Sequence, residues 1–387
     1  MSRDQSPFHH AWVRAAEAYD AIRDARKAHR TGYGRIIARF AELYLRRSFS
    51  IREIVSRGLL DPDITSEWLL WNLSKQSQYK LQAKLNPRAF WNLTEDKSVF
   101  YRFSLGAGLP VPRFFGCIAV VGTDSSMTSK QRARESAVRA LECAGADELV
   151  IKPSAGVYGR GVLAVSRRAG RFVDSDGEER SAGEVYDWVA GSREFDSFVV
   201  QERLQSHPEL ARLSGTSNLQ TVRMVTYVRE SGESVIGCCQ LKILGGDSLT
   251  DNYGDGRRGN LIGDIPDAAG HLAGVYRAAA TGSGLVAVDR HPRTGVPFRG
   301  FRLPFWPEAC RLVERAAEVF LPLRTIGWDV AITAEGPLLI EGNVTWDPAY
   351  EGEVGGEILR AIVADDKADA CDGGLRPSRV AMTRPRI

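Results

Sequence analysis

Residues 327–343 read GWDVAITAEGPLLIEGN, and this stretch decides the fold more than any other. Two runs of alternating apolar residues flank the turn-forming triplet AEG, a pattern that predicts a β-hairpin. With a three-residue loop, Thr333 lies opposite Pro337. The same register places Asp329 opposite Glu341, so the sequence predicts two carboxylates side by side on neighbouring strands.

Asn343 adds a third oxygen-bearing side chain to this pair. It follows Glu341 by two residues, and side chains on a strand alternate between faces, so both project from the same face. Like charges opposite each other cost roughly 0.2–1 kcal/mol, and a bound cation removes that cost. Hard oxygen ligands at this spacing suit Mg²⁺. The alternative is an edge hairpin with solvated acids, because a slip of one residue would move one acid to the opposite face.

The composition is that of an ordinary globular protein. The chain has 387 residues, 43% of them hydrophobic, which is enough for two or three domains. Its 51 basic and 48 acidic residues nearly cancel, which argues against a nucleic-acid-binding protein. Six scattered cysteines without a CxxC pair indicate reduced thiols. The sequence lacks an apolar run long enough for a membrane span or a signal peptide, so we expect a soluble, cytoplasmic protein.

Helical and strand-like segments alternate after a helical start, which predicts an α+β (α/β) fold. We expect four parts: an N-terminal helical region over 1–85, a first α+β portion with a glycine-rich lid over 86–196, a second portion with the metal site over 197–363, and a flexible tail over 364–387.

The glycine-rich stretch IKPSAGVYGRGV follows one apolar strand and precedes another. Gly156, Gly159 and Gly161 permit backbone amides to turn toward one anionic centre. The stretch lacks the P-loop pattern, so we predict a hairpin lid over phosphates, with an ordinary hairpin turn as the alternative. Lys152, at the end of the strand LVIKP, and Lys97 are the cations that could reach those phosphates.

The stretch FVVQERL at 198–204 is an apolar strand with a polar end. Such an end can present backbone groups to an adenine edge, with Val199 or Leu204 against the ring. Glu209 could accept hydrogen bonds from ribose hydroxyls, and the alternative is an exposed glutamate.

Arg223 lies in the run NLQTVRMVTYV, which predicts a central strand. A charged residue in a mostly buried sheet is seldom unpaired, so Arg223 binds either phosphate oxygens or a neighbouring acid. Lys242 in QLKIL could play a similar part. The polar, glycine-rich loop at 251–260 either frays or contributes to recognition.

Taken in order, these stretches resemble the ATP-grasp superfamily, and most closely its sugar-transfer-associated branch. The matching pieces are NPRAFWNLTEDKSVFYRF, IKPSAGVYGRGV, FVVQERLQSHPEL, NLQTVRMVTY, DNYGDGRRGN, HPRTG, GWDVAIT and LLIEGN. Each piece alone is common, but the set in this order is specific. It spans about residues 86–343.

The resemblance implies an ATP-grasp fold, in which two α+β subdomains grip ATP and one or two Mg²⁺ ions. It assigns residues to four roles: Lys97 and Lys152 to the phosphates, Gln201, Glu202 and Leu204 to the adenine, Arg223 to the transferred phosphoryl group, and Asp329, Glu341 and Asn343 to the metal.

The mechanism implied is that of a biosynthetic, ADP-forming carboxylate–amine ligase, in which ATP converts a carboxylate into an acyl phosphate that an amine attacks. Two alternatives stay open, a kinase for a sugar or other small-molecule hydroxyl and a nucleotide-binding module without turnover. We expect small-molecule partners and a possible homodimer, and neither nucleic acid nor membrane. The sequence departs from the family pattern at Arg257, Arg258 and the ending IEGNVTWDP, so the substrates are not defined.

Overall fold

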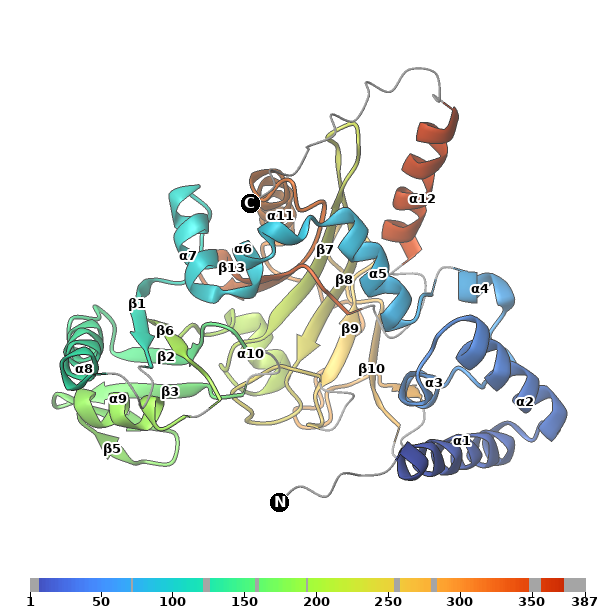
Figure 1. The fold of residues 1–387 in the computed structure, drawn as a ribbon, viewed down its shortest axis with the longest axis horizontal. Helices are drawn as coiled ribbons and strands as arrows, with labels where there is room; N and C mark the ends of the chain where they lie inside the picture. Colours follow the sequence, from blue (N-terminus) through green and yellow to red (C-terminus); the bar gives the residue numbers. More distant parts are fainter. Residues whose placement is uncertain are drawn as a thin grey trace, which may run out of the picture.

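A helical unit with its own apolar core precedes the first strand. The computed structural model describes residues 7–70, 72–120, 126–156, 160–192, 194–253, 258–279, 284–347 and 356–371. The helices of the unit are α1 (Pro7–His29), α2 (Tyr33–Ala41), the π-helix η1 (Glu42–Arg46), α3 (Ile51–Ser56) and α4 (Ser66–Leu70). Leu43, Ile54 and Leu59 are fully buried in the core between them. Figure 1 shows this unit at the far side of the molecule from β1–β6.

Six antiparallel strands form the first sheet. In spatial order they are β1 (Phe114–Ala119), β6 (Ser197–Glu202), β2 (Glu148–Pro153), β3 (Leu163–Arg168), β4 (Arg171–Asp174) and β5 (Glu179–Arg180). Helices α8 (Met127–Glu142) and α9 (Ala182–Ala190) pack on it, with Leu141 and Val185 in one cluster with Ile151 and Phe198. The strands form where apolar and polar residues alternate in the sequence. The helices form where apolar residues recur at helical spacing behind a capping serine.

The position of β6 moves the boundary between the two predicted α+β portions. The sequence places that boundary between residues 196 and 197, but β6 lies between β1 and β2 and pairs with both. A strand that is hydrogen-bonded on both sides cannot be separated from its sheet. The first portion therefore extends through β6.

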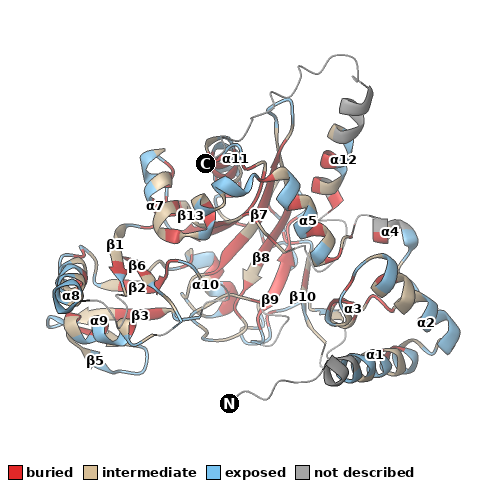
Figure 2. Ribbon diagram, in the orientation of Figure 1, coloured by how far each residue is buried: buried red, intermediate tan, exposed pale blue. Residues whose placement is uncertain are grey.

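Seven strands form the second sheet. In spatial order they are β11 (Leu285–Ala287), β10 (Gly274–Ala278), β9 (Leu261–Asp264), β8 (Ser234–Ile243), β7 (Thr221–Val228), β12 (Thr325–Thr333) and β13 (Gly336–Asn343). On β7, Val222 and Met224 face the core that contains α11 (Trp306–Val319), whereas Val225 and Tyr227 pack with α12 (Gly356–Cys371). Figure 2 shows β7, β8 and β9 as largely buried strands, and every residue of β12 is buried as well.

The last described helix occupies part of the predicted tail. We expected residues 364–387 to be flexible, but α12 continues to Cys371. Asp365 on α12 accepts hydrogen bonds from the Tyr227 hydroxyl (2.8 Å) and the Glu230 amide (3.1 Å). These contacts fasten α12 to the sheet, and residues 372–387 lie outside the described part of the chain.

Four further helices and one 3₁₀ turn complete the described body. The elements α5 (Lys75–Leu85), η2 (Arg88–Phe90), α6 (Asn92–Glu95) and α7 (Lys97–Gly106) precede β1, and α10 (Pro208–Ser214) joins β6 to β7. The predicted helical region includes α5, but this helix packs on the segment after β13. The Gln82 side-chain amide donates to the carbonyl oxygen of Trp346 at 2.8 Å. Asn86 likewise donates to Thr325 at 2.7 Å. None of the described helices combines the length and apolar character that a membrane span requires.

Candidate nucleotide and metal site

The turn of the acidic hairpin is shorter than the sequence suggested. Thr333 pairs with Gly336, so the loop has two residues instead of three, and the predicted pairing of Thr333 with Pro337 is wrong. Gly336 has a φ of +127°, a conformation that other residues rarely adopt. Glycine at this position therefore permits the tighter turn.

The predicted acid pair is nevertheless confirmed, because a β-bulge corrects the register. Val330 pairs with Leu339, whereas Asp329 pairs with Glu341, so Ile340 is an extra residue in β13. A bulge of this kind shifts the following residues by one position relative to the partner strand. It brings the two carboxylates opposite each other despite the shorter turn.

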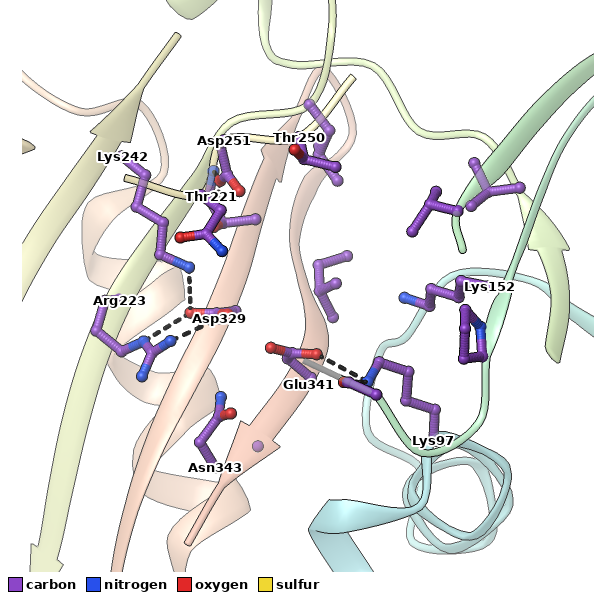
Figure 3. Close-up of a pocket in the computed structure, with 18 of the residues that line it drawn as sticks. Lys97, Lys152, Thr221, Arg223, Lys242, Thr250, Asp251, Asp329, Glu341 and Asn343 are labelled. Carbon is purple, nitrogen blue, oxygen red and sulfur yellow. Dashed lines mark hydrogen bonds and ion pairs between the residues drawn. The ribbon is translucent and has the colours of Figure 1, made fainter. Parts of the chain in front are cut away.

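A cavity of about 660 Å³ lies between the two sheets, and ten of the predicted site residues line it. Figure 3 shows the acidic and basic side chains of this group directed toward one another. The ten residues are Lys97, Lys152, Gly156, Gln201, Leu204, Arg223, Lys242, Asp329, Glu341 and Asn343.

Of the other four predicted residues, Glu202, Glu209 and Gly161 are not among the described residues that line the cavity. The Glu202 carboxylate binds the Arg113 amide (2.7 Å) and guanidinium (2.6 Å), because β6 pairs with the segment before β1. Glu209 is an exposed residue of α10 that pairs with Arg212. Gly161 has a φ of +70° and belongs to the loop between β2 and β3. Gly159 lies outside the described residues.

Asp329 is the most strongly held acid of the site. Its side chain accepts hydrogen bonds from Arg223 Nε (2.7 Å) and Nη2 (3.3 Å), and Lys242 Nζ lies 2.9 Å from Oδ1. Burial opposes ionisation, since only 5% of Asp329 is exposed, but attraction to Arg223 and Lys242 outweighs burial and holds the pKa well below its ordinary value. The ion pair that the sequence left open for Arg223 is thus the arrangement observed (Figure 3).

Glu341 pairs with a cation from a different part of the chain. Lys97, the first residue of α7, places Nζ 3.3 Å from Glu341 Oε2 and donates to the carbonyl oxygen of Gly156 at 3.1 Å. Asp96 caps α7 by accepting from the amides of Ser98 and Val99, which fixes where the helix begins. Lys97 therefore connects the acid hairpin with the glycine-rich loop.

Lys152 is buried at the end of β2, with 8% of its surface exposed. Its Nζ donates to the Tyr101 hydroxyl at 2.9 Å. Burial, and then repulsion by Lys97, lower the pKa of Lys152 to about 7. The described residues that line the cavity include six basic side chains against five acidic ones, and this small surplus of positive charge suits a polyanionic ligand. The basic residues are Lys97, Lys152, Arg160, Arg203, Arg223 and Lys242, and the acidic ones are Glu95, Asp251, Asp329, Glu341 and Asp347.

Residues 76–361 of the chain match the family described as "Sugar-transfer associated ATP-grasp". The match covers well over half of the sequence. The chain belongs to this ATP-grasp family. The predicted resemblance and fold are therefore confirmed. The two β-sheets around the cavity, with the helices that pack on them, form the body of the ATP-grasp fold.

Solved structures with a similar chain course include several enzymes. An N5-carboxyaminoimidazole ribonucleotide synthetase in complex with ADP is 12% identical (TM-score 0.40), and the match covers 75% of this chain and 58% of that one. D-alanine-D-alanine ligase from Helicobacter pylori is 9% identical (TM-score 0.38), and the match covers 70% of this chain and 58% of that one. Biotin carboxylase from Campylobacter jejuni is 13% identical (TM-score 0.39), and the match covers 79% of this chain and 53% of that one.

The ATP-grasp chain matches less than two thirds of the length of each of these three proteins. Similarity this low identifies neither a substrate nor a reaction. A search of the curated proteins finds no match to the sequence.

The acid hairpin of this ATP-grasp protein carries oxygen-bearing side chains that could hold a divalent ion. Asp329, Glu341 and Asn343 all line the cavity, and Asn343 donates through Nδ2 to the Gly327 carbonyl oxygen (3.2 Å), which leaves Oδ1 as a ligand oxygen. Two carboxylates and one amide oxygen are hard ligands of the kind that Mg²⁺ takes together with phosphate oxygens and water. Within the described residues, no group of three or more His, Cys, Asp or Glu side chains could hold a metal ion.

Several residues of the ATP-grasp site escaped the sequence reasoning. Tyr101 lies in the run KSVFYRF, where it is indistinguishable from an ordinary core aromatic. Tyr79 of α5 and Asp347, four residues after Asn343, line the cavity and are joined by a hydrogen bond of 2.7 Å. The only signal in the sequence was the unusual ending VTWDP after the hairpin.

Proposed function

We propose that this protein is an ATP-dependent ligase that activates a carboxylate as an acyl phosphate and joins it to an amine, with release of ADP and phosphate. The observation that carries the proposal is the pairing of Asp329 with Glu341 in the same cavity as six basic side chains. The family assignment supports the use of ATP.

The nucleotide would lie against the six-stranded sheet and its glycine-rich loop. Lys152 and Lys97 would neutralise phosphate oxygens, and Lys97 already contacts the loop at Gly156. Leu204 and Gln201, at the end of β6, would border the adenine. The Glu202 carboxylate and backbone amide are both bonded to Arg113, so this residue could offer the base only its carbonyl oxygen.

The metal ions would be held by Asp329, Glu341 and Asn343. Bound Mg²⁺ neutralises phosphate charge and orients the transferred group. Arg223 and Lys242, which hold Asp329 in this structure, would stabilise the charge that develops on the phosphoryl oxygens.

The proposed reaction has two steps. In the first, an oxygen of the substrate carboxylate attacks the γ-phosphorus of ATP, the bond to the bridging oxygen breaks, and ADP leaves. In the second, the amine attacks the acyl carbon, phosphate departs with the bonding electrons, and the amine loses a proton. Such transfers depend mainly on positioning and charge stabilisation, which the ring of charged side chains supplies.

The substrates would enter beside α5 and the segment that follows β13. Tyr79, Thr345 and Asp347 line this part of the cavity, and Lys75 Nζ lies 2.9 Å from Asp347. These polar groups would orient small molecules. We further propose that the protein works in the cytoplasm on a small-molecule carboxylate and amine, without nucleic acid or membrane, and that a homodimer is its candidate oligomeric state.

Product analysis tests the ligase proposal. Pairs of carboxylates and amines are screened for release of ADP and phosphate, and hydroxylamine is added to trap an acyl phosphate as a hydroxamate. We expect ADP, phosphate and a hydroxamate that depends on the carboxylate. Formation of AMP and pyrophosphate would rule out the proposed chemistry.

A kinase is the second candidate, because hydroxyl and carboxylate groups of Tyr79, Thr345 and Asp347 suit the hydroxyls of a sugar. The description of the family as sugar-transfer associated favours the same substrate class. A stable phosphorylated product formed without any amine would select this function. Nucleotide binding without any turnover over the whole screen would favour a binding module.

A further inference from the structure

Tyr101 of α7 is fully buried, and its hydroxyl contacts both sheets. The oxygen lies 2.9 Å from Lys152 Nζ on β2 and 2.7 Å from Gln201 Oε1 on β6, which are strands of the six-stranded sheet. It also lies 2.9 Å from the carbonyl oxygen of Ile340 on β13, in the seven-stranded sheet. One hydroxyl thus joins the two halves of the cavity.

The roles of the partners in this network follow from their chemistry. Lys152 donates to the hydroxyl oxygen, and the single hydroxyl proton is shared between Gln201 Oε1 and the Ile340 carbonyl. Burial, and then the charge of Glu341, raise the pKa of Tyr101 well above its ordinary value, so the phenol keeps its proton and remains a donor. Tyr101 can therefore accept from the lysine and donate to a strand at the same time.

The strand that Tyr101 contacts is the one that sets the acid pair. Ile340 is the extra residue of the β-bulge, and the bulge is what places Glu341 opposite Asp329. A strand shifted by one residue would turn Glu341 to the opposite face. The hydroxyl therefore lies between Lys152 and the residue on which the register of the acids depends.

We propose that Tyr101 is a positioning residue of the nucleotide site, whose hydroxyl holds Lys152 in register with the bulged strand that carries Glu341. The inference rests on the proposed function, in which Lys152 neutralises phosphate. The ring packs against Phe100 and Phe114, at centroid distances of 5.6 and 5.7 Å, so a phenylalanine fills the same space. Tyr101→Phe removes only the polar contacts.

A double-mutant cycle separates positioning from packing. Affinity for Mg–ATP is measured by calorimetry for the wild type, Tyr101→Phe, Lys152→Met and the double variant. We expect Tyr101→Phe to weaken binding about tenfold in the wild-type background, as for a lost hydrogen bond to a charged group, and less than twofold when Lys152 is already Met.

Tyr227→Phe is the matched control. Tyr227 is also a buried tyrosine, but its hydroxyl contacts Asp365 and Arg324, away from the residues that line the cavity. Its loss should lower the melting temperature and leave ATP affinity unchanged. Equal affinity of Tyr101→Phe and wild type, or an equal loss in both Lys152 backgrounds, would overturn the positioning role while the proposed function stands. A wild-type protein that binds no ATP would contradict both.

Discussion

The two sheets contribute to the cavity in different ways. The six-stranded sheet supplies one buried lysine, Lys152, and otherwise neutral groups such as Val150 and Gln201. The seven-stranded sheet supplies two acids together with the cations that hold one of them, Arg223 and Lys242. The acidic and basic side chains that the seven-stranded sheet contributes are thus equal in number, whereas the six-stranded sheet contributes one positive charge without a matching acid.

This difference indicates that the six-stranded sheet mainly binds the nucleotide and that the seven-stranded sheet mainly supports the reaction. A surplus cation in a buried position attracts an anionic ligand, whereas the paired acids must give up a basic partner when a metal ion binds them. Changes in the seven-stranded sheet should therefore affect turnover, and changes in the six-stranded sheet should affect nucleotide affinity. The following predictions test that contrast.

The largest effect is expected from Asp329→Asn. The amide cannot neutralise a metal ion or its two basic partners, so we expect ATP turnover to fall by about 10²–10³-fold, as for loss of a major electrostatic group. Asp264→Asn is the control, since Asp264 is a buried acid of β9 that is not among the residues lining the cavity. Steady-state ADP release measures both. Equal losses in the two variants would mean that the contrast reflects stability alone.

The pH dependence of ATP binding isolates Lys152. Its pKa of about 7 means that the charged form, which attracts phosphate, is lost as the pH rises above 7. Binding then requires proton uptake, so affinity should fall by up to about tenfold per pH unit above 7. Titration calorimetry in buffers of different ionisation enthalpy measures that uptake. Lys152→Met should bind weakly with no such proton uptake, and uptake that persists in this variant would assign it to another group.

Gly161→Ala should weaken nucleotide binding by about fivefold, because its φ of +70° disfavours a side chain. An added Cβ would also lie 2.8 Å from a ring carbon of Phe195. Gly145→Ala, in the same half of the molecule, meets no atom within 4 Å and should bind as the wild type does. Fluorescence titration with a labelled ATP analogue compares the two. Equal affinity of the two variants for the ATP analogue would show that the conformation of the glycine-rich loop does not affect nucleotide binding.

The smallest effect is expected from Glu209→Gln. The sequence suggested that Glu209 contacts ribose, but the exposed side chain pairs with Arg212 instead. Affinity for ATP should therefore change by less than about twofold, the range of exposed ion pairs. Competition between ATP and 2′-deoxy-ATP would reveal a ribose contact. A tenfold weaker affinity of the variant for ATP alone would restore the original assignment.

The sequence predicted the acid pair but not the reason for it. Alternation of apolar residues identified the hairpin, since that pattern reflects burial on one face. The turn length was wrong, because AEG permits both two- and three-residue loops, and the bulge at Ile340 has no local signature. The two errors cancel at Asp329 and Glu341.

Long-range contacts account for the remaining differences. Glu202 meets Arg113, which lies 89 positions earlier, and Tyr101 meets Ile340, which lies 239 positions later. No pattern of spacing along the chain indicates such partners. The predicted boundary between residues 196 and 197 was wrong for the same reason, because β6 pairs with β1 and β2, which come from two earlier segments of the chain.

The central claim is that Asp329, Glu341 and Asn343 together hold a divalent ion that binds with the nucleotide. Titration of Mn²⁺ in the presence of a non-hydrolysable ATP analogue, followed by electron paramagnetic resonance, tests it most directly. The account predicts nucleotide-dependent Mn²⁺ binding by the wild-type protein and at least tenfold weaker binding by Glu341→Gln. Equal Mn²⁺ affinity of the two proteins would contradict it.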